Sequence, residues 1–513
     1  MGNSERTDGQ RYDVIVVGSG SAGAVVARRL VDRGDVRVLL LEAGRTDTNP
    51  AIHDVARMHE LWDGDDDWAI RTTPQIHAAE RQLQWPRGRV LGGSSALNGM
   101  IWVRGNPYDY DMWAYAGNAG WAWSDVKPLF EEIEDFMEVR KDVQPDPFHQ
   151  AIIDAAVEVG IPYNPDYNGE SQLGISRMQY VIKGGTRNST ARAYLGAVLD
   201  HPNLTILTES AARRLLFERD RCVGVEYERA GGLERAYAEG EVVVSGGTIG
   251  SPGLLLASGI GPADDLRALG IDVVANLPGV GRNLHDHLLS SIIYASKEIP
   301  PATYGVPYMQ THLFAKSDPG LLVPDLQPLH FAIPMYEPWM EPLSPTGFTL
   351  MAGMVRPQSR GTIKLAGPDP SDGLLIDPHV LEAQADVDML LAAIDVVRSI
   401  GSASPLAGEW QAEELYPGPG VTSERDLTNY VRRTVVTYHH QVGTCKMGVD
   451  VEAVVDPRLA VYGVEGLRVA DASIMPAVTT GNTHAPTVMI GERAARWVVD
   501  ALSSRPTPAG AAV

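Results

Sequence analysis

The sequence predicts an α/β protein in which a nucleotide-binding domain is interrupted by a second domain with an antiparallel sheet. Its first apolar run, Asp13–Val17, is followed by the glycine-rich turn Gly18–Gly23 and the helical run Ala24–Leu30. From about residue 300 to 370, short β-type segments alternate with Pro-rich joints. A pattern of the first type returns at Arg468–Ala470. Together these patterns indicate a parallel sheet, an antiparallel sheet and a chain that returns to the parallel one.

The glycine-rich turn has the spacing of a dinucleotide-binding fingerprint. Gly18 permits the tight turn, Gly20 lets a pyrophosphate approach the backbone, and Gly23 lets helix and strand pack closely. The start of the helix, beside Ser21, offers free N–H groups and a positive dipole end to phosphates. A second apolar strand, 36–41, ends next to Glu42, whose carboxylate can accept hydrogen bonds from a ribose. We find no second fingerprint of this type, so the bound cofactor is expected to meet the substrate directly.

The remaining elements follow from hydrophobic periodicity. In the nucleotide part we expect strands at 204–207, 213–217, 223–227 and 242–244, and a turn, helix and turn over 246–261. In the antiparallel sheet we expect strands at 311–315, 329–332, 349–354 and 362–365. Helices are expected at 386–398, 424–431 and 485–502.

Composition excludes several classes of function. The chain has 513 residues, which favours two or three domains. A net charge of −22 argues against nucleic acid and anionic membrane surfaces as partners. We expect no membrane segment, because no apolar run approaches 18 residues and the first ten residues carry no signal core. Cys222 and Cys445 form neither a disulfide framework nor a zinc pattern, so we predict no metal site and a reducing, cytoplasmic location.

Three motifs carry a resemblance to a known family. They are GRVLGGSSALNGMIWVRG at 88–105, GTIGSPGLLLASGIG at 247–261 and PGVGRNLHDHL at 278–288. From Asp13 to about Val498 the chain resembles the glucose-methanol-choline (GMC) oxidoreductases. The resemblance implies FAD, a Rossmann-like FAD-binding domain and a substrate domain with a large antiparallel sheet flanked by helices. We assign 1–160, 190–295 and 440–513 to the FAD-binding domain, and 161–189 and 296–439 to the substrate-binding domain.

The resemblance also implies a catalytic pair near the end of the chain. In this family a histidine just before a Val-Gly-Thr stretch faces the flavin, and that position is His440. Its partner position is Asn482. A neutral imidazole can remove the hydroxyl proton of an alcohol near pH 7, and an amide can orient the alcohol without competing for the proton. Neighbouring His439 is expected to point the other way, as a packed residue, and His285 and His287 are interpreted as structural.

Further cofactor contacts are implied by register with the family motifs. His484 is expected at the pyrimidine edge of the flavin. Some relatives attach FAD covalently to a histidine at the position of Leu97, which cannot form that bond, so we predict non-covalent FAD. The full set of expected cofactor residues is Gly18, Gly20, Ser21, Gly23, Glu42, Arg89, Gly93, Asn98, Ala212, Asp471, Ala472 and His484.

Aromatic and sulfur-containing side chains indicate the substrate. The expected wall consists of Met58, Trp62, Tyr304, Tyr308, Met309, Phe331, Met335, Tyr336 and Trp339. It favours oxidation of a primary, apolar or aromatic alcohol to the aldehyde, with O2 as the slightly favoured electron acceptor. A choline-type alcohol caged by Glu337 or Glu341, and an acceptor other than oxygen, remain alternatives. So do a non-redox cyanohydrin lyase and a flavin-binding protein without turnover, although the His440 and Asn482 pair argues against the last.

Overall fold

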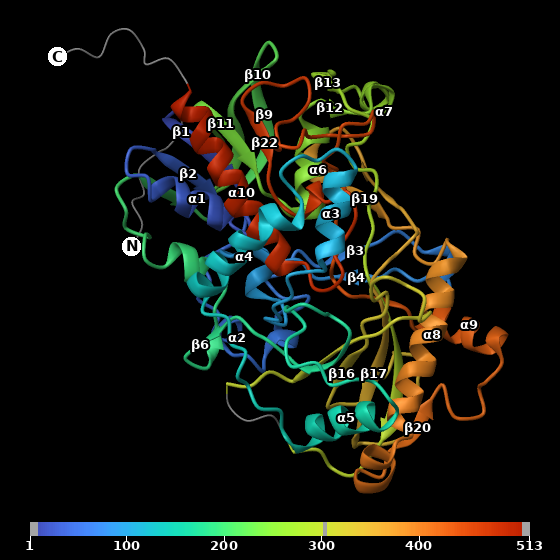
Figure 1. Ribbon diagram of the computed structural model, residues 1–513. Coiled ribbons are helices and arrows are strands. Elements are labelled where there is room, and N and C mark those ends of the chain that lie inside the picture. Colours follow the sequence, from blue (N-terminus) through green and yellow to red (C-terminus); the bar gives the residue numbers. More distant parts are fainter. Residues whose placement is uncertain (1–8, 301–304, 505–513) are drawn as a thin grey trace.

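The computed structural model describes residues 9–300 and 305–504. Two sheets dominate it (Figure 1). One is a seven-stranded, mostly parallel sheet with α1 and α10 beside it, and the other is a five-stranded antiparallel sheet with α5 and α8 near it. The α/β fold class is therefore confirmed.

The seven-stranded sheet has the order β8-β2-β1-β11-β10-β9, and β22 pairs with β11. β1, β2, β8, β11 and β22 are parallel, whereas β9 and β10 are antiparallel additions. β2 and the C-terminal parts of β1 and β11 are apolar and buried, as expected where both faces of a parallel sheet are covered. The strands are β1 (Arg11–Val17), β2 (Val38–Leu41), β8 (Leu204–Leu207), β9 (Ser210–Glu218), β10 (Arg221–Arg229), β11 (Gly232–Val244) and β22 (Leu467–Val469).

Helices from both ends of the chain pack on this sheet. α1 (Gly23–Val31) contacts α10 (His484–Ser503), which also contacts α4 (Trp123–Met137). Figure 1 shows α10, in red, beside the blue α1. The close packing of α1 against the turn that follows β1 depends on glycine, because a Cβ on Gly23 would lie 1.9 Å from the carbonyl oxygen of Gly18. Gly18 itself has φ +96°, which favours glycine.

The antiparallel sheet has the order β16-β17-β14-β20, with β21 also paired to β14. Its helices are α8 (Gln384–Gly401), which packs on β14 and β17, and α9 (Glu424–Thr434), which packs on β14. α5 (Pro147–Glu158) contributes to the same hydrophobic core. The strands are β14 (Leu288–Ala295), β16 (Leu329–Phe331), β17 (Gly347–Met354), β20 (Glu413–Tyr416) and β21 (Val436–Thr437).

Two predicted strands belong elsewhere. β15 (Thr311–Phe314) pairs with β5 (Gly174–Arg177), and β18 (Thr362–Leu365) pairs with β19 (Leu374–Asp377). The prediction missed β14, the strand at the centre of the sheet, because its sequence LLSSIIYA is buried on both faces and does not alternate. β14 also lies inside the stretch 190–295 that the sequence assigned to the FAD-binding domain, so the antiparallel sheet begins earlier in the chain than that division.

The remaining elements are short or peripheral. None of the helices in the described ranges is long and apolar enough to cross a membrane. These elements are α2 (Pro50–His53), α3 (Pro107–Tyr115), α6 (Gly247–Ala257), α7 (Ala263–Ala268), β3 (Ile70–Arg71), β4 (Gln84–Trp85), β6 (Ile182–Lys183), β7 (Thr186–Arg187), β12 (Ile260–Gly261), β13 (Ala275–Asn276), η1 (Met58–Leu61), η2 (Ile76–Ala78), η3 (Gly93–Ala96), η4 (Ala191–Leu195), η5 (Pro370–Asp372), η6 (Pro405–Glu409) and η7 (Ala472–Ile474).

Candidate active site

The structure brings His440 and Asn482 together. His440 follows β21 at the edge of the antiparallel sheet, and Asn482 lies in the loop that leads into α10. Nε2 of His440 is 3.1 Å from Nδ2 of Asn482, and both side chains are buried. The segment after β21 and the loop before α10 therefore contribute one member each to the predicted pair.

His440 is fixed from three directions. Its backbone N–H donates to Oδ1 of Asp286 at 2.8 Å. Its Nδ1 lies 2.9 Å from Nδ1 of His287, and its ring stacks on Tyr438 at 4.6 Å between centroids. His287, interpreted from sequence as structural, thus touches the candidate base directly. His285, in contrast, accepts a hydrogen bond from the backbone N–H of Val478 and holds a loop.

Asp286 joins the two segments that meet at this edge. Its carboxylate accepts hydrogen bonds from the backbone of His440, from the hydroxyl of Thr437 and from the amide of Gln441. Burial raises the pKa of Asp286 to about 6, although these hydrogen bonds oppose the shift. The sequence motif NLHDH contained this residue, and a carboxylate between two histidines was the signal that could have drawn attention to it.

The imidazole of His440 is neutral in the folded protein. Burial lowers the pKa of His440 well below its ordinary value, and the neighbouring His287 and His439 lower it further. Because Asn482 presents an N–H donor to Nε2, that nitrogen carries a lone pair, and the proton of the ring lies on Nδ1, toward His287. A neutral imidazole with its lone pair at Nε2 can accept a proton there.

His439 faces away from this pair. Its ring lies edge-to-face against Trp62 at 5.2 Å, and its carbonyl accepts a hydrogen bond from Arg87 at 2.8 Å. Its φ of +65° is strained for a residue with a side chain. The structure therefore separates the two adjacent histidines as the sequence predicts.

Asn482 has its own partner, which the sequence did not indicate. Its Oδ1 accepts a hydrogen bond from Nε2 of Gln327 at 3.0 Å. The same nitrogen of Gln327 lies 2.6 Å from Nε2 of His312. Gln327 lies in an irregular segment without a recognisable motif, so only the tertiary structure reveals it.

The glycine turn lies where a dinucleotide can bind. Glu42 accepts hydrogen bonds from the N–H and hydroxyl of Ser19 and from the N–H of Gly44. A Cβ on Gly20 would meet only Gly93 Cα at 3.9 Å, so the backbone is open there. Within the described chain, no side chain caps the N-terminus of α1. The N–H of Ala24 donates to the carbonyl of Gly20 at 3.2 Å, and the helix end presents the positive end of its dipole to an anion.

His484 links this turn to α10. Its Nδ1 lies 3.0 Å from the hydroxyl of Ser21. Its Nε2 is buried and has no hydrogen-bond partner among residues 9–300 and 305–504. Such an orphaned polar atom calls for a ligand or water. The open glycine turn, the uncapped helix and the free nitrogen of His484 fit the predicted FAD.

The other predicted cofactor residues lie in different settings. Arg89 is exposed, with its guanidinium over the ring of Trp68, whereas Oδ1 of Asn98 accepts from Arg187. Ala212 lies on β9 and is partly buried. Asp471 accepts from Ser251, from Ser473 and from the N–H of Gly247, and its pKa is raised by burial. Its carboxylate therefore holds the turns around Ala472.

The predicted substrate wall is mixed. Trp62 contacts His439, and Met309 is buried. Trp339 is 40% exposed, with Arg433 over its ring at 3.8 Å, so it does not form part of a closed wall. Tyr304 lies outside the described residues. Met58, Phe331 and Tyr336 are partly buried against the two hydrophobic cores.

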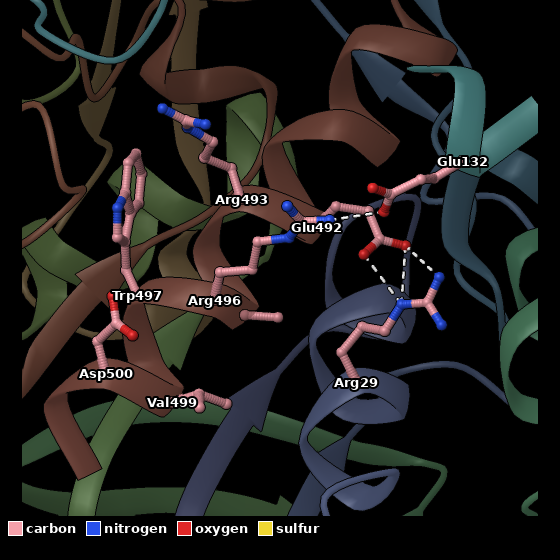
Figure 2. A pocket seen from close by; sticks show the side chains of 9 residues that line it. Arg29, Glu132, Glu492, Arg493, Arg496, Trp497, Val499 and Asp500 are labelled. Carbon is pink, nitrogen blue, oxygen red and sulfur yellow. Dashed lines mark hydrogen bonds and ion pairs between the residues drawn. The ribbon is translucent and has the colours of Figure 1, made fainter. Parts of the chain in front are cut away.

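A surface hollow of about 580 Å³ lies elsewhere, along α1, α4 and α10 (Figure 2). Its floor is an ion pair in which Arg29 donates to both oxygens of Glu492, and Tyr194 also donates to Glu492. Arg496 pairs with Glu132 at its rim. These groups satisfy one another and tie the first helix to the last one.

Comparison with known proteins agrees with this geometry. The N-terminal and C-terminal profiles of the GMC oxidoreductases match residues 12–289 and 357–491. The chain is 38% identical to an alcohol dehydrogenase [acceptor] of Pseudomonas putida, over 95% of this chain and 96% of the relative. It is also 38% identical to the mitochondrial choline dehydrogenase of Mus musculus, over 94% and 89% of the respective chains. Among solved structures, pyridoxine 4-oxidase from Mesorbium loti superposes with a TM-score of 0.89 at 34% identity, covering 94% of this chain and 98% of its own. The chain belongs to the GMC oxidoreductase family.

Proposed function

We propose that this chain is an FAD-dependent enzyme that oxidises a primary, neutral alcohol to the aldehyde. The observation that carries the proposal is the 3.1 Å contact between Nε2 of His440 and Nδ2 of Asn482, beside an open glycine turn that suits FAD. His440 is the general base, and Asn482 orients the alcohol. The alcohol and choline dehydrogenases among the relatives support a hydroxyl group as the reacting group.

The residues of the chain divide the work. His440 accepts the hydroxyl proton at Nε2, while Asn482 donates to the alcohol oxygen and holds it near that nitrogen. Asp286 and His287 keep the imidazole in place by contacts to its backbone and Nδ1. FAD, when bound at the glycine turn and α1, would supply the acceptor for the hydride that leaves the alcohol carbon.

A neutral substrate is favoured over a quaternary ammonium. Glu337, which could cage a cation, is paired with Arg81 at 3.3 Å. Glu341 is exposed. A buried carboxylate near the site, Asp286, already accepts three hydrogen bonds. A cation would therefore gain little from these acids.

An anaerobic panel of alcohols tests the proposal. Benzyl alcohol, choline and 3,3-dimethylbutan-1-ol, the uncharged isostere of choline, are mixed with the holoenzyme while flavin absorbance is followed. We expect the two neutral alcohols to bleach the flavin faster than choline. Faster bleaching by choline than by its isostere would overturn the substrate assignment, and no bleaching by any alcohol would contradict alcohol oxidation.

Readmission of air to the reduced enzyme tests the acceptor. We propose O2, and expect the flavin colour to return within seconds, with formation of hydrogen peroxide. Colour that returns only after addition of an artificial quinone would assign another acceptor. This alternative has support from the relative named for an unspecified acceptor.

We propose that FAD is held without a covalent bond. Leu97 occupies the position where some relatives carry the attaching histidine, and it packs in a small apolar cluster with Ala96 and Val90. Acid precipitation should leave the yellow colour in the supernatant, and a yellow pellet would contradict the proposal. Cys222 and Cys445 are both free and buried, which supports the proposed cytoplasmic location.

A further inference from the structure

A chain of side-chain contacts runs behind the candidate catalytic pair. His440 contacts Asn482, Asn482 accepts from Gln327, and Gln327 contacts His312. Gln327 is 0% exposed and His312 is 1% exposed. Oε1 of Gln327 and Nδ1 of His312 have no hydrogen-bond partner in residues 9–300 and 305–504, so Nε2 of Gln327 alone links Asn482 to His312. Because these groups are buried, loss of either contact would leave a further polar atom unsatisfied.

The backbone of Gln327 is fixed at two points, whereas Oε1 of its side chain has no hydrogen-bond partner among the described residues, so the amide is oriented by the contacts of Nε2. Its backbone N–H donates to the carbonyl of Gly353 at 2.9 Å, and its carbonyl accepts from the hydroxyl of Tyr438 at 3.3 Å. A Cβ on Gly353 would lie 2.2 Å from the carbonyl oxygen of Gln327, so glycine is needed for this close approach. Tyr438 also stacks on His440, so one side chain contacts both the backbone of Gln327 and the candidate base.

The two ends of the Asn482 amide have opposite effects on His440. An N–H toward Nε2 requires a lone pair there and keeps the imidazole a base. An oxygen toward Nε2 would instead favour a proton on that nitrogen and stabilise the imidazolium. The donor of Gln327 binds Oδ1 of Asn482 and so turns Nδ2 toward His440.

We propose that Gln327 is a positioning residue that decides which end of the Asn482 amide faces His440, and that His312 holds the amide of Gln327. This inference rests on the proposed roles of His440 and Asn482. By this inference Gln327 does more than pack: it sets the protonation state of His440 before the substrate binds.

Gln327→Met tests this proposal, because methionine keeps the length of the side chain and removes both amide groups. In ¹⁵N spectra of histidine-labelled holoenzyme, with His440 assigned by its loss in His440→Gln, we expect Nε2 of wild-type His440 to be unprotonated. In Gln327→Met the signal should move toward the protonated value. Gln310→Met is the matched control, since Gln310 is also buried but bonds Asp146 and Pro307. An unchanged His440 signal in Gln327→Met would overturn the inference.

A double-mutant cycle gives a second readout with the fastest alcohol of the panel. Gln327→Met should lower the rate constant of anaerobic flavin reduction at least about tenfold in the wild type. In an Asn482→Ala background it should lower it by less than about twofold, because the residue acts through Asn482. Equal losses in both backgrounds would refute positioning through Asn482. Undiminished reduction in Asn482→Ala and His440→Ala would instead refute the proposed catalytic pair, while the ¹⁵N result would still decide the role of Gln327.

Discussion

At the scale of single residues, the site depends on neutral buried imidazoles. His440 and His439 are adjacent, yet one contacts Asn482 and the other contacts Trp62. Burial lowers the pKa of His439 to about 3, so both rings are uncharged at neutral pH. The two rings differ in their surroundings. Of the two, His440 has the amide of Asn482 at Nε2 and His287 at Nδ1.

Replacing each histidine separately tests this distinction. His440→Ala should retain FAD but lose on the order of 10²–10⁴ in the rate constant of flavin reduction, the usual contribution of a general base. His439→Ala should be much milder, since it removes only the contact with Trp62. Stopped-flow absorbance under anaerobic conditions measures both. Flavin reduction at the wild-type rate in His440→Ala would show that another residue is the base.

At the scale of elements, the glycine turn separates two requirements that sequence motifs combine. Gly23 serves the protein itself, because its Cβ would collide with the carbonyl of Gly18. Gly20 borders open space, as the proposed binding of FAD there requires, because its Cβ would meet no protein atom nearer than 3.9 Å. One glycine therefore shapes the strand-helix contact, and the other keeps space in front of α1.

Alanine at each glycine should give different results. Gly20→Ala should leave the melting temperature of the apoprotein within about 2 °C and weaken FAD binding, since the methyl group enters the cofactor space. Gly23→Ala should lower both the melting temperature and the affinity for FAD, because α1 must move. Gly408→Ala, in η6, is the control, since its Cβ meets no heavy atom of the described chain within 4 Å. Calorimetry and flavin fluorescence report the two quantities, and equal melting of the Gly20 and Gly23 variants would contradict this division.

At the scale of the whole molecule, the fold buries several histidine side chains. Burial lowers the pKa of His287, His312, His330 and His439 to about 3 each. In the unfolded chain these rings titrate near pH 6.5. The unfolded state therefore binds more protons than the folded state between about pH 6.5 and 3.

Stability of the protein should consequently fall with acid in this window. Each of the four rings contributes up to about 1.4 kcal/mol per pH unit, fully present above pH 6.5 and lost as the pH falls toward 3. Carboxyl groups whose pKa burial raises oppose this trend; they are Asp286, Glu42, Asp109, Glu337 and Asp471. Groups whose pKa is lowered add to it; they are His285, His440, His484, Asp66, Glu134 and Asp146. Urea unfolding of the holoenzyme with excess FAD at pH 7 and pH 5 measures the difference. Equal or greater stability at pH 5 would refute it, and His330→Gln should reduce the slope.

The sequence was most informative where a function demands a local pattern. The turn Gly18–Gly23, the carboxylate of Glu42 and the family motifs led to the fold class and the family, both of which are confirmed. Individual strands were harder to place. β15 and β18 have strand sequences, but which sheet a strand joins depends on partners far along the chain. β14 was missed because a strand buried on both faces does not alternate.

By itself the sequence determined the family, the nucleotide turn and the identity of two candidate catalytic side chains, because these depend on residue type and local spacing. The tertiary structure alone decided what surrounds them. It placed His287 against Nδ1 of His440 and Gln327 against Oδ1 of Asn482. Such contacts join segments 153 and 155 residues apart, so no local pattern encodes them. The physical reason is that a buried hydrogen bond is specified by mutual geometry, which exists only once the folded chain has brought these distant segments together.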